Sequence, residues 1–256
     1  MQLTQIRNAT VRITYAGTRF LVDPMLAPKG SYPGFPGTLN DHLSNPLVEL
    51  PMSLDEITDV DAVIVTHTHL DHWDPVAAQV IPKEKTMFVQ HQQDAELLEQ
   101  AGFRDIRVLD EHTEFNGITL VKTPGQHGSD TTIAALRERL GEVCGIIFQH
   151  PAEKNVYLAG DTVWNDMVRQ TLSRFCPETV ILNAGDAQIP ALGSIIMGKD
   201  DLWQVHQAAP DATLIAVHLE AVNHAALSRR ELAAFVAEKS ISGQVLIPQD
   251  GETLMC

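Results

Sequence analysis

Apolar and polar positions alternate near the start of the chain in the way typical of a β-hairpin. Residues 11–15 place apolar side chains at every second position, residues 16–18 supply a turn, and residues 20–22 are apolar again. We therefore predict two paired strands that end at Asp23-Pro24. Residues 28–51 are too rich in Gly and Pro for regular structure, which is typical of a functional loop.

The rest of the chain alternates between short β-branched runs and longer helical patterns, which predicts an α/β fold. We expect strands at residues 62–66, 87–90, 106–109, 117–122, 143–149, 156–159, 179–182, 213–217 and 245–247. We expect helices at residues 94–101, 165–175, 199–209 and 228–239. The last helix opens with Ser228 and Glu231, the spacing of a capping box.

Composition limits the class of protein and its partners. With 256 residues, 44% of them hydrophobic, the chain can bury one large layered core or two small ones. The 18 Lys and Arg against 33 Asp and Glu give a net charge of −15, which repels phosphate backbones, so we expect a small-molecule substrate and no nucleic acid. Neither a secretory signal nor an apolar run of about 20 residues is found, so we expect a cytoplasmic protein without a transmembrane segment.

Ligand-type side chains are concentrated directly after the predicted strand at residues 62–66. His67 and His69 point the same way in an extended segment because side chains alternate with period two, and a turn after them can bring Asp71 and His72 to a second point. This spacing predicts two adjacent metal sites at the carboxyl end of a buried strand. Imidazole and carboxylate ligands without Cys suit Zn, Mn or Fe rather than a structural thiolate site.

The segment HTHLDH resembles the HxHxDH signature of the metallo-β-lactamase superfamily. His127 in TPGQHGS, Asp161 in YLAGDT and His218 in LIAVH follow in the order that this superfamily shows. The segments LVDP around Asp23 and SIIMGKDD around Met197 resemble the branch with ascorbate-6-phosphate lactonase and N-acylphosphatidylethanolamine phospholipase-like hydrolases. The resemblance implies a four-layered αββα sandwich, with two mixed sheets flanked by helices, formed by residues 1–256 as one hydrolase domain.

The resemblance also implies a full set of ligands for two divalent metal ions, with zinc favoured over manganese or iron. It places His67, His69 and His127 on the first ion, Asp71, His72 and His218 on the second, and Asp161 between them as a bridge. His224 is an alternative to His218 as the last ligand, and we assign it to substrate contact or support of a ligand, with a capping or surface role as the alternative. The candidate catalytic residues are Asp71, Asp161 and His224.

Two cations that share a water lower its pKa, so that hydroxide forms near neutral pH without a serine or cysteine nucleophile. We predict hydrolysis of a small-molecule ester or lactone, with a phosphodiesterase acting on a nucleotide or phospholipid-type substrate as the alternative. A di-iron redox protein is disfavoured because that group resembles HxExD, whereas this chain has His69. A non-catalytic binding protein is disfavoured by the intact ligand set.

We expect the apolar residues of the loop at 28–51 and of the segment at 189–198, namely Leu192, Ile195, Ile196 and Met197, to line or cover the cleft. They would then select a substrate with a hydrophobic part. Contact within the core, or within a homo-oligomer, is the alternative for these residues.

Overall fold

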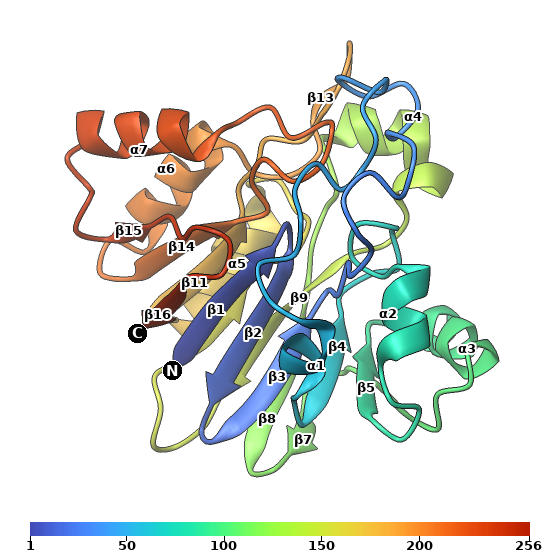
Figure 1. The fold of residues 1–256 in the computed structure, drawn as a ribbon. Coiled ribbons are helices and arrows are strands. Elements are labelled where there is room, and N and C mark those ends of the chain that lie inside the picture. Colours follow the sequence, from blue (N-terminus) through green and yellow to red (C-terminus); the bar gives the residue numbers. More distant parts are fainter.

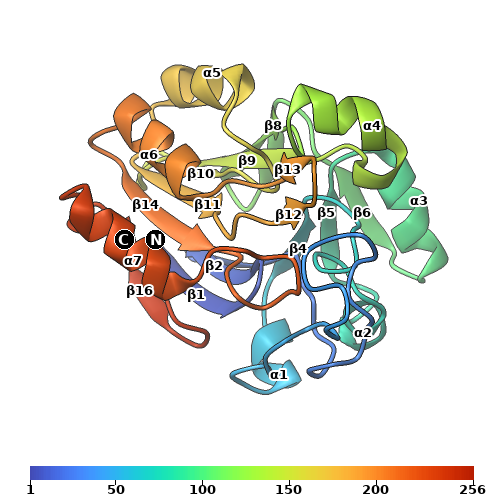
Figure 2. The same cartoon turned by 90° about the horizontal axis from the view of Figure 1, so that it is seen from above.

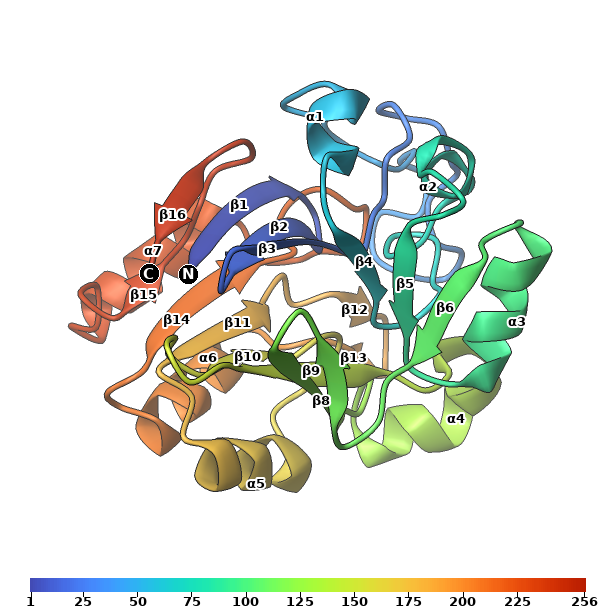
Figure 3. The same cartoon turned by 90° about the horizontal axis from the view of Figure 1, so that it is seen from below.

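Two mixed sheets packed face to face form the centre of the computed structural model, which describes residues 1–256 (Figure 1). Helices cover the outer face of each sheet, so the layers run helix, sheet, sheet, helix when the molecule is seen from below (Figure 3). This architecture confirms the predicted αββα sandwich.

The first sheet contains seven strands and joins the two ends of the chain. In spatial order its strands are β16 (Thr253–Met255), β1 (Gln2–Arg7), β2 (Thr10–Tyr15), β3 (Thr18–Val22), β4 (Ala62–Val65), β5 (Thr86–Val89) and β6 (Asp105–Val108). The pairs from β16 to β3 are antiparallel and those from β3 to β6 are parallel. The pairing of β1 with β16 sets Leu3 opposite Leu254.

The second sheet also has seven strands and is mixed in the same way. In spatial order they are β15 (Val245–Leu246), β14 (Thr213–Val217), β11 (Thr179–Asn183), β10 (Val156–Leu158), β9 (Cys144–Gln149), β8 (Ile118–Pro124) and β7 (Thr113–Phe115). Parallel pairing runs from β15 to β10, and antiparallel pairing runs from β10 to β7. A separate hairpin joins β12 (Gln188–Ile189) to β13 (Gly193–Ser194).

The helices divide between the two outer layers and the rim. They are α1 (Leu54–Thr58), α2 (Pro75–Val80), α3 (Gln92–Gln100), α4 (Asp130–Leu140), α5 (Asp166–Phe175), α6 (Lys199–Ala208) and α7 (Arg229–Glu238). Ile57, Ala77 and Leu98 pack α1, α2 and α3 on the first sheet. Val168, Leu202 and Leu232 pack α5, α6 and α7 on the second sheet. Helix α4 instead packs Leu140 against the segment that contains β12 and β13.

The layer between the sheets is closed by large apolar side chains. Phe20 of β3 and Phe148 of β9 meet edge to face with ring centroids 5.5 Å apart, and both are 0% exposed. This packing fixes the two sheets relative to each other. It therefore also fixes the loops at their common upper end, which Figure 2 shows from above.

Every strand and helix predicted from the pattern is present, with ends that differ by at most two residues. Residues 28–51 contain neither a helix nor a named strand, as predicted, and their only bridge joins Tyr32 to Asn45. The pattern did not predict β1, β7, β12, β13, β16, α1, α2 or α4.

Candidate metal centre

All seven side chains predicted as metal ligands lie together at one rim of the sandwich. His67, His69, Asp71 and His72 follow β4, His127 follows β8, Asp161 follows β10, and His218 follows β14. The side chains form three overlapping groups, and within each group the ligand atoms lie within 4.8 Å of one another. The groups are His67–His69–His127, His67–His72–Asp161 and Asp71–His72–His218. Residues that are remote along the chain thus share one centre.

Asp161 lies between two sets of ligands, His67–His69–His127 and Asp71–His72–His218. Its Oδ2 is 3.1 Å from Nε2 of His72, 3.6 Å from Nε2 of His127 and 3.8 Å from Nε2 of His67. Its Oδ1 is 3.8 Å from Nε2 of His218. A carboxylate in this position lies within 4 Å of ring nitrogens from both sets.

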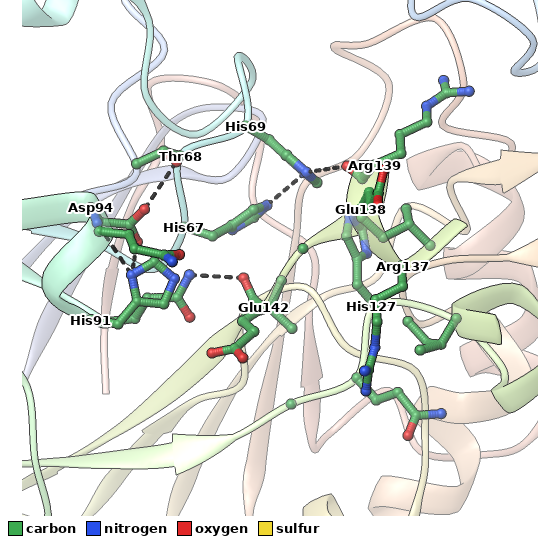
Figure 4. Close-up of a pocket in the computed structure, with 18 of the residues that line it drawn as sticks. His67, Thr68, His69, His91, Asp94, His127, Arg137, Glu138, Arg139 and Glu142 are labelled. Carbon is green, nitrogen blue, oxygen red and sulfur yellow. Dashed lines mark hydrogen bonds and ion pairs between the residues drawn. The ribbon is translucent and has the colours of Figure 1, made fainter. Parts of the chain in front are cut away.

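Backbone carbonyls fix the orientation of two of the rings. Nδ1 of His127 donates to the carbonyl of Ile195 at 2.7 Å. Nε2 of His69 donates to the carbonyl of Arg139 at 3.1 Å (Figure 4). A carbonyl only accepts hydrogen bonds, so these nitrogens carry the protons and the opposite nitrogens turn lone pairs toward the centre. At the centre, Nδ1 of His69 lies 3.0 Å from Nε2 of His67.

The second histidine group shows the same arrangement. Nδ1 of His72 donates to Oδ2 of Asp23 at 2.9 Å, which turns Nε2 of His72 toward the centre. Nε2 of His72 faces the carboxylate of Asp161 at 3.1 Å, and Nε2 of His218 is buried and has no hydrogen-bond partner. Buried polar atoms without a partner are costly in free energy, and a cation is a natural partner for ring nitrogens and carboxylates that meet at one point. The residues present therefore fit a bound metal.

Burial and charge set the protonation of the centre. Burial lowers the pKa of His67 well below its usual value and that of His127 to about 4, so both rings are neutral at neutral pH. Burial alone would lower the pKa of His72, but the carboxylates of Asp161 and Asp23 raise it well above the usual value. The same negative charge attracts a cation.

Two residues outside the predicted set support the ligands. Asp23 accepts hydrogen bonds from Nδ1 of His72 and from the backbone N–H of Thr66, the latter at 2.7 Å, and its φ is 47°. Asn183, the last residue of β11, donates to Oδ1 of Asp161 at 2.6 Å. The resemblance had marked Asp23 only as part of LVDP, although its place at a strand end was a usable signal. Nothing in the sequence pattern marks Asn183.

His224 lies beside the centre and outside the three ligand groups, whereas His218 is part of one. The side chain of His224 is 6% exposed, and its ring meets the ring of Phe35 edge to face, with centroids 4.9 Å apart. Burial lowers the pKa of His224 to about 4. The ring is therefore neutral, and it lines a cavity together with Asp71 and Asp161.

Two cavities meet at the centre. A polar cleft of about 880 Å³ opens on His67, His69 and His127 (Figure 4). A cavity of about 130 Å³ lies over Asp71 and Asp161, and its apolar lining is Phe35, Leu70, Leu140, Ile189 and Ile195.

The loop at 28–51 and the segment at 189–198 therefore both contribute to the lining, as predicted, through Phe35, Ile189 and Ile195. The prediction was wrong for Met197, which is 1% exposed and packs in the core outside the second sheet. It was also wrong for Ile196, which is 0% exposed and packs with Leu140 instead of lining either cavity.

Comparison with known proteins identifies the family. The sequence model of the beta-lactamase superfamily domain matches residues 18–219, a segment that includes every predicted ligand. The chain belongs to this family. The predicted resemblance to the metallo-β-lactamase superfamily is thereby confirmed.

Three relatives show the extent of the similarity. The UPF0173 protein YddR of Bacillus subtilis is 52% identical over 254 residues, which cover 99% of each chain. The crystal structure of isothiocyanate hydrolase from Delia radicum gut bacteria has 47% sequence identity and a TM-score of 0.97, and the match covers 100% of this chain and 99% of that chain. An N-acyl-phosphatidylethanolamine-hydrolyzing phospholipase D of Caenorhabditis elegans is 27% identical over 84% of this chain and 62% of its own length.

The family match and the clustered ligands identify the chain as a metal-dependent hydrolase of the metallo-β-lactamase fold. None of its helices combines the length and apolar character needed to cross a membrane.

Proposed function

We propose that the protein hydrolyses the isothiocyanate group of small organic molecules with an apolar substituent, using two divalent cations. The observation that carries the proposal is the apolar cavity directly over Asp71 and Asp161, at the centre where the ligand groups meet. The similarity over the whole chain to an isothiocyanate hydrolase supports the choice of substrate. Zinc is the favoured metal, with manganese or iron as alternatives.

The reaction converts R–N=C=S and water into R–NH₂ and O=C=S. The oxygen of water bonds to the central carbon, the carbon–nitrogen bond breaks, and both water protons end on the nitrogen. Divalent cations at this centre would lower the pKa of water and polarise the electrophile. The thiol of Cys144 does not replace water here, because it is fully buried and burial raises its pKa.

The protein side chains hold and orient the reactants. His67, His69 and His127 would hold one cation and Asp71, His72 and His218 the other, with Asp161 between the two sets. Phe35, Ile189 and Ile195 exclude water from the apolar substituent. Neutral His224 lies at the same cavity and can hydrogen-bond the reacting group.

The test combines metal analysis of the purified protein with an assay for carbonyl sulfide and amine release from allyl isothiocyanate. We expect metal-dependent release that His127→Ala and Asp161→Ala abolish. The control is His112→Ala, whose side chain is 73% exposed and is in none of the ligand groups. Esters and lactones, the class predicted from the sequence, are assayed in parallel. Absence of carbonyl sulfide from the metal-loaded protein, with turnover of lactones, would replace the isothiocyanate by the predicted class.

A further inference from the structure

One buried amide holds the loop at 28–51 against the site. Asn223 is 1% exposed. Its Oδ1 accepts hydrogen bonds from the backbone N–H of Phe35 at 3.0 Å and from Nδ2 of Asn45 at 2.8 Å. Its Nδ2 donates to Oγ1 of Thr38 at 2.8 Å and to the carbonyl of Leu39 at 2.6 Å. An amide has two acceptor and two donor positions, so the side chain of Asn223 is fully used by this loop.

The backbone of Asn223 adds to the same attachment. Its N–H donates to Oδ1 of Asn45 at 2.8 Å, and its carbonyl accepts from Nδ2 of Asn40 at 3.2 Å. A buried polar group with every partner present rigidifies its surroundings, because moving any partner leaves an unsatisfied group away from water. The middle of the loop is therefore a fixed wall rather than a free lid.

This wall carries Phe35 into the apolar cavity. The backbone N–H of Phe35 is one of the groups bonded to Asn223, and its ring packs edge to face on His224, the next residue after Asn223. The same ring lines the cavity of about 130 Å³ over Asp71 and Asp161. The position of the ring thus decides how far the cavity extends from the reacting centre.

We propose that Phe35 limits the length of the apolar substituent that the protein accepts, and that Asn223 is the positioning residue that keeps Phe35 in place. The identity of the substrate rests on the proposed function. The position of the loop does not, because it follows from the hydrogen bonds alone.

The first test compares kcat/KM for 4-phenylbutyl and allyl isothiocyanate. We expect Phe35→Ala to raise the long-to-short ratio roughly tenfold, the scale at which pockets discriminate small apolar differences. Asn223→Ala should also raise this ratio. The ratio of the double variant should not exceed the ratio of Phe35→Ala. Asn155→Ala removes an amide bonded to the carbonyl of Phe175 and should leave the ratio unchanged. A merely structural role of Asn223 would lower both kcat/KM values equally, and an unchanged ratio in Phe35→Ala and Asn223→Ala overturns the proposal.

The second test is hydrogen exchange at the backbone amide of Phe35, which needs no substrate. Asn223→Ala should accelerate exchange there, whereas Asn155→Ala should not. If Asn223→Ala does not fold, Asn223→Leu serves, because it keeps a side chain of similar size and removes the oxygen that accepts from the backbone N–H of Phe35. Unchanged exchange in the variant overturns the positioning role. A wild-type protein that turns over no isothiocyanate refutes the proposed function instead, and the length ratio is then measured on lactones with the same substituents.

Discussion

Asp23→Asn should weaken metal binding although it replaces none of the assigned ligands. Asp23 is 1% exposed, and its Oδ2 accepts from Nδ1 of His72 at 2.9 Å and from Oγ1 of Thr66 at 2.7 Å. Its Oδ1 accepts from the backbone N–H of Thr66 at 2.7 Å. An asparagine has one acceptor oxygen, which the N–H of Thr66 requires, so its NH₂ group faces His72. Nδ1 of His72 must then accept, and the ring proton moves to Nε2, on the side of the metal centre.

The structure sets the size of the effect on stability and of the effect on metal binding. Hydrogen bonds to a charged group contribute about 1.5–3 kcal/mol each, and two of the three at Asp23 are lost or reversed, so the free energy of unfolding should fall by about 3 kcal/mol. Partners that orient a metal-bound histidine change metal affinity about 10- to 100-fold when they are replaced. We expect the zinc affinity of Asp23→Asn to fall by that factor.

Asp74→Asn is the matched control. Asp74 is also 1% exposed and accepts from the backbone N–H groups of Leu26, Ala27 and Ala77, but it forms no hydrogen bond or ion pair with any of the assigned ligands. Urea unfolding of both metal-free variants should show similar losses of stability. Competition with a chelator should show weakened zinc binding in Asp23→Asn alone. Equal zinc affinity in the two variants would refute the reasoning about the tautomer of His72.

Two further predictions concern the scaffold. The hydroxyl and backbone N–H of Ser228 lower the pKa of Glu231, so Glu231→Gln should lower the melting temperature at pH 7. This effect should shrink as pH falls through the usual pKa of a glutamate and be lost below the lowered pKa of the folded chain, where the carboxylate is protonated in both folded and unfolded chains. An effect that grows on acidification would contradict the sign. Phe148→Ala should lower the free energy of unfolding by about 3–5 kcal/mol in urea titrations, because it opens a cavity between the sheets. A loss below about 1 kcal/mol would show that the layer repacks.

The sequence predicted the strands that are buried on both faces and missed elements whose formation depends on distant partners. Residues 62–65 and 214–217 are continuous apolar runs, which is the pattern of parallel strands covered on both sides. Strand β1 forms by pairing with β16 at the other end of the chain, and no local pattern encodes that contact. Helix α4 is interrupted at Leu136, where φ is −133°, so its apolar positions do not keep a helical period.

In the candidate site, too, the sequence predicted some features and missed others. The histidines and aspartates were predicted because their residue types and order carry the signature. The attachment of the loop to Asn223 was not, since it joins residues that are 178 to 188 positions apart. The chemistry of the centre is therefore encoded locally, whereas the walls that shape its cavity depend on tertiary contacts. The assignment of residues 1–256 to one domain stays a prediction.

Strand register explains why His218, and not His224, lies in a ligand group. Strands β10, β11 and β14 are parallel, with Leu158 opposite Ile181 and Asn183 opposite Val217. Asp161 and His218 leave this edge directly after their strands, so their side chains meet. The φ of His218 is 60°, and its carbonyl lies where a Cβ on Gly185 would approach to 2.0 Å, so only glycine at 185 leaves room for this turn. The chain then runs on to His224 beside the loop that Asn223 holds, which gives the later histidine a place at the substrate cavity.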